Sequence, residues 1–133
     1  MSVTKDYYIY NAVVSTLAAG ATQTEVINIE ADANFIVQKM AYYATLGTAT
    51  PTNDDKIVPL IGISILDSGS GRNLQDQAVP LSSLAGTGAL PFVLPIPRLF
   101  KARSSINIKF NNFSTLDEYT NITLSLIGHK IFS

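Results

Sequence analysis

A strict two-residue alternation near the C-terminus constrains the fold of this chain more than any other feature. From residue 105 to residue 111, polar residues alternate with two isoleucines and a phenylalanine, which is the period of a strand with one buried and one solvated face. Residues 121–132 repeat the pattern and become apolar on both faces from Ile127 onwards. The polar stretch between the two strands predicts a loop, so we expect them to form an antiparallel hairpin.

Segments with the composition of strands recur along the rest of the chain, separated by turn signals. The expected strands cover residues 7–14, 22–29, 35–44, 57–66 and 72–77, and a short apolar piece follows at 79–84. The segment 35–44 also fits a short helix, but its length and flanks favour a strand. The run Asp-Ser-Gly-Ser-Gly at 67–71 predicts a tight turn in which either glycine can take a positive φ. Seven or eight strands without an amphipathic helix predict an all-β fold, an antiparallel β-sandwich of the jelly-roll form.

The chain is long enough for one domain with its own core. A protein of 133 residues buries about two thirds of the surface that its unfolded chain exposes. No repeat, linker or low-complexity tract divides the sequence, so residues 1–133 are expected to form a single β-sandwich domain. Residues 1–10 or so are expected to form a short N-terminal arm.

Residues 91–100 combine three prolines with large apolar side chains in the run Pro-Phe-Val-Leu-Pro-Ile-Pro-Arg-Leu-Phe. Proline fixes φ and lacks an N–H, so this segment is extended and cannot donate a full ladder of hydrogen bonds. We expect it to lie along the edge of a sheet or to cross between two sheets. A polyproline recognition peptide is the alternative, but such ligands are usually exposed and disordered.

Charged residues make up only 14% of the chain and hydrophobic residues 47%, against about 25% charged in ordinary globular proteins. Two explanations are open: a well-filled core under an uncharged polar surface, or a surface that is covered in an assembly. The formal net charge is −1, and no basic cluster provides the electrostatic footprint that nucleic acid requires. The longest apolar-leaning run, residues 56–66, is interrupted by Pro59 and Gly62 and is too short to span a bilayer.

No catalytic, cofactor or metal site is predicted, and we expect the protein not to be an enzyme. The single histidine, His129, lacks an evident nucleophile and orienting carboxylate, and cysteine is absent. The Asn-Asp-Asp run at 53–55 lacks the spacing of a calcium loop. The Gly-Ser-Gly at 69–71 lacks the Lys-Ser/Thr of a phosphate loop.

Several segments of the sequence resemble small structural proteins of tailed bacteriophages. They are Asn-Ala-Val at 11–13, Leu-Ala-Ala-Gly-Ala-Thr-Gln at 17–23, Asp-Ser-Gly-Ser-Gly-Arg at 67–72, the run at 94–100 and Leu-Ile-Gly-His-Lys-Ile-Phe at 126–132. The resemblance covers nearly the whole chain, rests on turn and strand patterns, and is closest to capsid cement or decoration proteins. It implies a β-sandwich or jelly-roll subunit, a homo-dimer or homo-trimer, that binds the major capsid protein on the outside of the shell. It also implies assembly in the host bacterial cytoplasm, no cofactor, and no direct contact with nucleic acid or membrane.

The N-terminal aromatic residues and the Pro-rich run are the predicted contacts with a partner, because Tyr, Phe and Arg are enriched at interface hot spots. The alternative for each residue is ordinary packing within the sandwich. Other functions left open are a phage neck, tail or head-fibre component, and a carbohydrate-binding β-sandwich module. The predicted contact residues are Tyr7, Tyr8, Tyr10, Pro95, Pro97, Arg98, Leu99 and Phe100.

Overall fold

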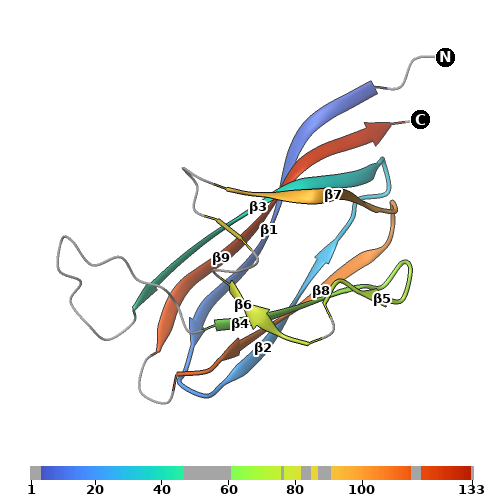
Figure 1. Ribbon diagram of the computed structural model, residues 1–133. Coiled ribbons are helices and arrows are strands. Elements are labelled where there is room, and N and C mark those ends of the chain that lie inside the picture. The colour runs from blue at the N-terminus through green and yellow to red at the C-terminus, as the bar shows by residue number, and fades with distance from the viewer. Residues whose placement is uncertain are drawn as a thin grey trace.

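Nine strands form two antiparallel sheets in the computed structural model, which describes residues 4–46, 61–75, 77–81, 85–86, 91–114 and 118–132 (Figure 1). Seven of the strands are long, and β5 and β6 have two residues each. Their bounds are β1 Thr4–Leu17, β2 Thr22–Asn28, β3 Asn34–Leu46, β4 Ile61–Asp67, β5 Arg72–Asn73, β6 Val79–Pro80, β7 Phe92–Phe100, β8 Ser105–Asn112 and β9 Tyr119–Phe132.

The order of the strands is that of a jelly roll. Sheet A has the order β1-β9-β3-β7, and sheet B has the order β2-β8-β4-β5, with β6 also paired to β4. Along the chain the long strands alternate between the two sheets, and the last strand lies beside the first. This wrapping of a four-stranded and a five-stranded sheet around one core is the jelly-roll form of the β-sandwich. The predicted all-β sandwich of jelly-roll form is confirmed.

The core lies between the sheets and is built from alternate residues of each long strand. In β9 the buried residues include Ile122, Leu124 and Leu126, and in β8 they are Ile106, Ile108 and Phe110. These two sets face each other from opposite sheets, as the two-residue period requires.

The predicted hairpin between the two C-terminal strands is wrong. β8 pairs with β2 and β4 in sheet B, whereas β9 pairs with β1 and β3 in sheet A. The alternation correctly identified the buried face of each strand. It carries no information about the neighbouring strand, because two strands that cover one core from opposite sides show the same pattern as two that pair.

β7 lies at the edge of sheet A, as the prolines predicted. It pairs with β3 at residues 92–93 and again at 98–100, and the register shifts between these stretches. The interruption contains Pro95 and Pro97, which lack the N–H that a regular ladder needs. The Pro-rich segment is therefore an edge strand with a break in its middle.

Residues 4–10, which belong to the predicted N-terminal arm, form the first half of β1 and are in continuous register with β9. The predicted strand 72–77 is shorter than expected, because β5 has two residues, and the short apolar piece at 79–84 contains the two-residue β6. β5 ends after Asn73 because the side-chain Oε1 of Gln75 accepts the hydrogen bond from the Ile65 N–H at 2.9 Å, in place of the main chain. The predicted loop 47–56 and residues 1–3 lie outside the described residues.

Candidate functional site

The outward face of sheet A is rich in apolar side chains that no other part of the described chain covers. We call this surface the apolar face. Its members alternate with core residues along all four strands, and most of them are at least a third exposed. The apolar members are Tyr7, Ile9 and Val13 from β1, Ile36 and Tyr43 from β3, Val93 and Leu99 from β7, and Ile127 and Ile131 from β9.

The register of the strands places these residues in continuous rows. Tyr7 lies opposite His129, and His129 lies opposite Ile36. Ile36 in turn lies opposite Leu99 on the edge strand, so one row crosses the whole sheet. Side chains directly opposite each other are close enough to touch. The next row outward on the same face consists of Ile9, Ile127, Lys39 and Val93.

The apolar face has few ionisable side chains, and none of those in the described strands is acidic. Lys5 and Lys39 are its ammonium groups, and the outward residues described on this sheet include no Asp or Glu. His129 lies in the middle of the face, where its Nδ1 is 3.3 Å from Oε1 of Gln38. The side chain of His129 is therefore in contact with the amide of Gln38 on this face.

The outward face of sheet B has a different chemistry. Its β2 and β8 residues are mainly Thr, Asn, Ser and Lys, with Val26 as an exposed exception. Thr22 Oγ1, for example, donates to Asn111 Oδ1 at 2.5 Å across the strands. This polar face needs no cover, so the two outward faces of the sandwich are chemically distinct.

Some of the predicted contact residues lie on the surface. Tyr7 is 73% exposed on the apolar face, and Leu99 lies on the same face. Pro95 and Pro97 are exposed in the irregular middle of β7. These four remain available to a partner.

Two predicted contacts belong to the interior of the subunit, and a third is half-buried. Tyr10 and Phe100 are buried, and the Tyr10 ring packs edge-on against Phe35 with 4.8 Å between ring centres. Tyr8 is half-buried on the same inward side of β1. Alternation along β1 separates the three tyrosines, because the side chains of Tyr8 and Tyr10 point to the opposite face of the strand from Tyr7.

Arg98 is also on the inward side of β7. Its Nη2 donates to Asp67 Oδ2 at 3.0 Å and to Ser70 Oγ at 3.2 Å. This ion pair links the edge strand of sheet A to the turn after β4 in sheet B.

A buried lysine closes one end of the sandwich. Lys130 Nζ lies 2.7 Å from Glu30 Oε2, 3.5 Å from Asp32 Oδ2 and 4.0 Å from the centre of the Tyr8 ring. Burial disfavours the charged ammonium, but the hydrogen bond to Glu30 and the attraction of Tyr10, Asp32 and Glu30 outweigh it and raise the pKa of Lys130. The hydrogen bond from Lys130 is also the main cause that lowers the pKa of Glu30. The cluster ties the loop after β2 to β9.

Sequence reasoning missed the exposed members Ile9, Val13, Tyr43 and Val93. A signal was present in the first strand, where Ile9 and Val13 fall on the opposite parity from Ala12 and Val14. A strand that is apolar on both faces must cover a second surface as well as its own core.

The described ranges contain no group of three or more His, Asp or Glu side chains placed to hold a metal ion. Within the same ranges, no helix has the length and apolar character needed to cross a membrane. The Asn-Asp-Asp run considered for calcium lies outside the described residues.

The class of protein defined by the fold is a jelly-roll β-sandwich with one apolar outward sheet face. No family model matches the chain, and no curated protein matches it. Among solved structures, the infectious bursal disease virus VP2 subviral particle is similar at 15% sequence identity with a TM-score of 0.33. That alignment covers 96% of this chain and 33% of the virus protein, so the chain spans about a third of the length of VP2. Because the TM-score is low, the jelly-roll assignment rests on the strand order alone.

Proposed function

We propose that this protein is a non-enzymatic structural subunit of a virion, which docks on other protein through the apolar face of sheet A. The observation that carries the proposal is the asymmetry between the two outward faces. Sheet A exposes rows of large apolar side chains, while the outward face of sheet B is mainly hydroxyls, amides and an ammonium group, with Val26 and Phe113 as its exposed apolar residues. A free monomer has no use for such an arrangement, because contiguous apolar surface promotes association.

The size of the apolar face fits a specific protein interface. The four strands of sheet A have 14, 14, 13 and 9 residues. With about 4.8 Å between strands and about 3.3 Å per residue, they span on the order of 800 Å². A standard interface buries about 800 Å² on each partner, so a face of this size is large enough for one interface.

Within this role we favour a capsid cement or decoration protein on the outer surface of a shell built from a major capsid protein. The resemblance of the sequence to the cement proteins of tailed bacteriophages supports this assignment. The jelly-roll topology and the low content of charged residues are compatible with it. A homo-dimer or homo-trimer on the virion, assembled in a bacterial cytoplasm, belongs to the same proposal.

Mixing the purified protein with capsid shells that lack it tests the proposal. We expect the protein to co-sediment with the shells and to saturate at a fixed number of copies for each capsomer. Binding to isolated necks, tails or fibres in place of shells would assign it elsewhere on the virion. Binding to a glycan panel together with failure to bind shells would contradict the structural role.

A further inference from the structure

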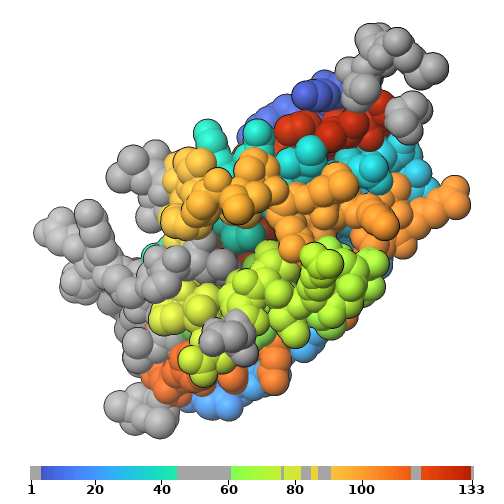
Figure 2. All heavy atoms as spheres, turned by 45° about the vertical axis from the view of Figure 1, so that its right-hand side comes forward, coloured from blue at the N-terminus to red at the C-terminus, as the bar shows by residue number. Residues whose placement is uncertain are grey.

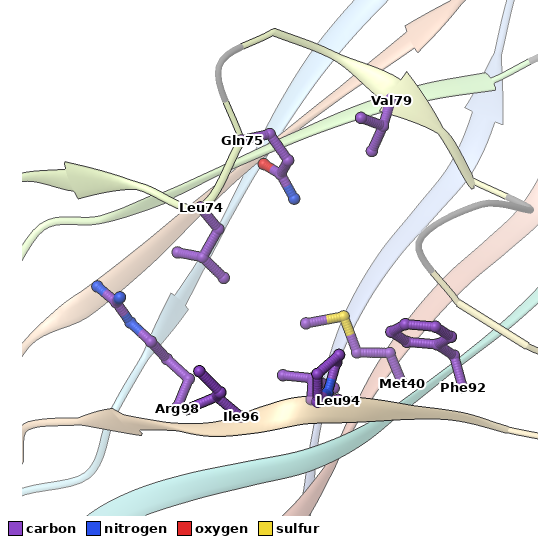
Figure 3. A pocket seen from close by; sticks show the side chains of 9 residues that line it. Met40, Leu74, Gln75, Val79, Phe92, Leu94, Ile96 and Arg98 are labelled. Atoms are coloured by element: carbon purple, nitrogen blue, oxygen red, sulfur yellow. The ribbon is translucent and has the colours of Figure 1, made fainter.

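A cavity of about 470 Å³ opens between the sheets, where β7 faces the short strands of sheet B (Figures 2 and 3). The inward side chains of Phe92, Leu94 and Ile96 form one wall, and Leu74 and Val79 form the other. In Figure 2 the mouth lies between the orange atoms of β7 and the green to yellow atoms that follow β4. Because β5 and β6 are only two residues long, the described part of sheet B covers β7 incompletely.

Ile96 shows how open this wall is. It is 81% exposed although it lines the cavity. It lies between Pro95 and Pro97, in the stretch where β7 is out of register with β3. The break in the ladder thus holds a large apolar side chain at the mouth.

A second hollow of about 300 Å³ adjoins the first, and the two share Ile96 and Arg98 as a common wall. Its lining is basic, with Arg72, Arg98 and Lys101 set against the single carboxylate of Asp67. Asp67 is already bonded to Arg98 and to Ser70. No ion pair of Arg72 or Lys101 occurs within the described residues, so this hollow carries an excess of positive charge.

Two side chains with hydrogen-bond donors line the hollows: Gln75 lines the apolar cavity, and Arg98 lies in the wall that the two hollows share. The Oε1 atom of Gln75 accepts the Ile65 N–H, which turns the amide nitrogen toward the cavity (Figure 3). The Nε of Arg98 is buried and has no hydrogen-bond partner.

We infer that the paired hollows bind a small anionic amphiphile, with its chain in the apolar cavity and its carboxylate or phosphate head in the basic hollow. Ligand pockets of about 300–1,000 Å³ are typically apolar with a few placed polar groups. An apolar cavity of about 150 Å³ holds benzene, so this one has room for a chain on the order of 12 carbons. The inference does not depend on the proposed virion role.

The test is a titration of the full-length protein with 12-carbon probes below their micelle concentrations. Dodecanoate and dodecyl phosphate are the anionic probes, and dodecanol and dodecyltrimethylammonium are the neutral and cationic controls. We expect saturable one-to-one binding of an anionic probe, at least about tenfold tighter than either control, because hydrogen bonds to charged groups supply about that factor. The better of the two anionic heads identifies the natural head group.

Two substitutions with matched controls locate the site. Ile96→Glu puts a carboxylate on the shared wall and should weaken anionic probes at least about tenfold, because like charges repel. Val93→Glu, on the opposite face of the same strand, should leave binding within about twofold. The double variant Arg72→Ala and Lys101→Ala should weaken anionic probes while leaving dodecanol unchanged.

Three results would overturn the inference. They are the absence of saturable binding by both anionic probes, equal binding of the cationic probe, and equal losses from Ile96→Glu and Val93→Glu. Far-ultraviolet circular dichroism of each variant separates lost binding from lost fold.

Discussion

Lys130 joins three separate segments at one end of the sandwich. It lies on β9, bonds to Glu30 in the loop after β2, and places its ammonium over the Tyr8 ring of β1. The ammonium is enclosed but fully partnered, which is the condition under which a buried charge is tolerated. Its role is to fix the loop 29–33 against sheet A.

Replacing Lys130 with alanine removes the ion pair, the contact with the ring and the buried stem of the side chain. The ion pair itself contributes little, since Glu30 is about half exposed. Lost packing and the lost cation–π contact bring the expected destabilisation to about 2 kcal/mol. Urea unfolding measures it, with Lys109→Ala on the polar face as a control that should change stability by less than about 0.5 kcal/mol. Equal effects of the two variants would show that the cluster is not stabilising.

Glu30 gives the stability a defined dependence on acid. Its pKa is lowered in the folded state from the ordinary value of 4.5, first by the hydrogen bond from Lys130 and then by the attraction of that charge. A group with a lowered folded pKa stabilises the protein above its ordinary pKa and stops doing so as the pH falls through the lowered value. The difference in unfolding free energy between the wild-type protein and Glu30→Gln should therefore be largest near neutral pH. It should shrink as the pH falls below 4.5; a constant difference would contradict this.

At the scale of elements, the sequence predicted the strands better than their partners. The edge position of β7 followed from the missing N–H groups of Pro95 and Pro97, which is a local property of the chain. The pairing of β8 and β9 with other strands could not be predicted in the same way, because alternation reports burial and not neighbours. The apolar face could be predicted from the sequence, because residues 7–14 and 127–132 carry apolar side chains on both faces of their strands. The run of tyrosines in β1 obscures this pattern, because Tyr8 and Tyr10 point to the opposite face from Tyr7.

The contact between β9 and β3 is close enough to forbid a side chain at Gly128. A Cβ added there would meet the backbone carbonyl oxygen of Ile36 on the neighbouring strand. That carbonyl cannot move without disturbing the ladder in which Val37 lies opposite Gly128, so Gly128→Ala should cost about 3 kcal/mol or more.

Gly62→Ala is the matched control for this close approach. The added Cβ would meet only the ring of Phe113, a half-exposed side chain that can turn away. We expect a loss of about 1 kcal/mol, and thermal unfolding compares the two variants. A loss at Gly62 as large as that at Gly128 would argue against the packing of β9 on β3.

At the scale of the whole molecule, the jelly roll separates two surfaces of different chemistry. Sheet A turns apolar rows outward and sheet B turns polar side chains outward, while both share one core. Few charged residues are needed on a subunit whose apolar side is covered in an assembly. Docking through sheet A, as proposed above, would give the unusual composition and the unequal faces one cause.

Two valines provide the most direct measurement of this claim. Val13 on the apolar face is 53% exposed and Val26 on the polar face is 52% exposed, and both lie within edge strands. A lysine at either position reaches solvent in the free protein, so both variants should fold with less than about 0.5 kcal/mol change in stability. In co-sedimentation with shells that lack the protein, Val13→Lys should reduce affinity by about tenfold or more, because it buries a charge at the interface. Val26→Lys should bind as the wild-type protein does. Equal binding by both variants, or a loss confined to Val26→Lys, would contradict docking through sheet A.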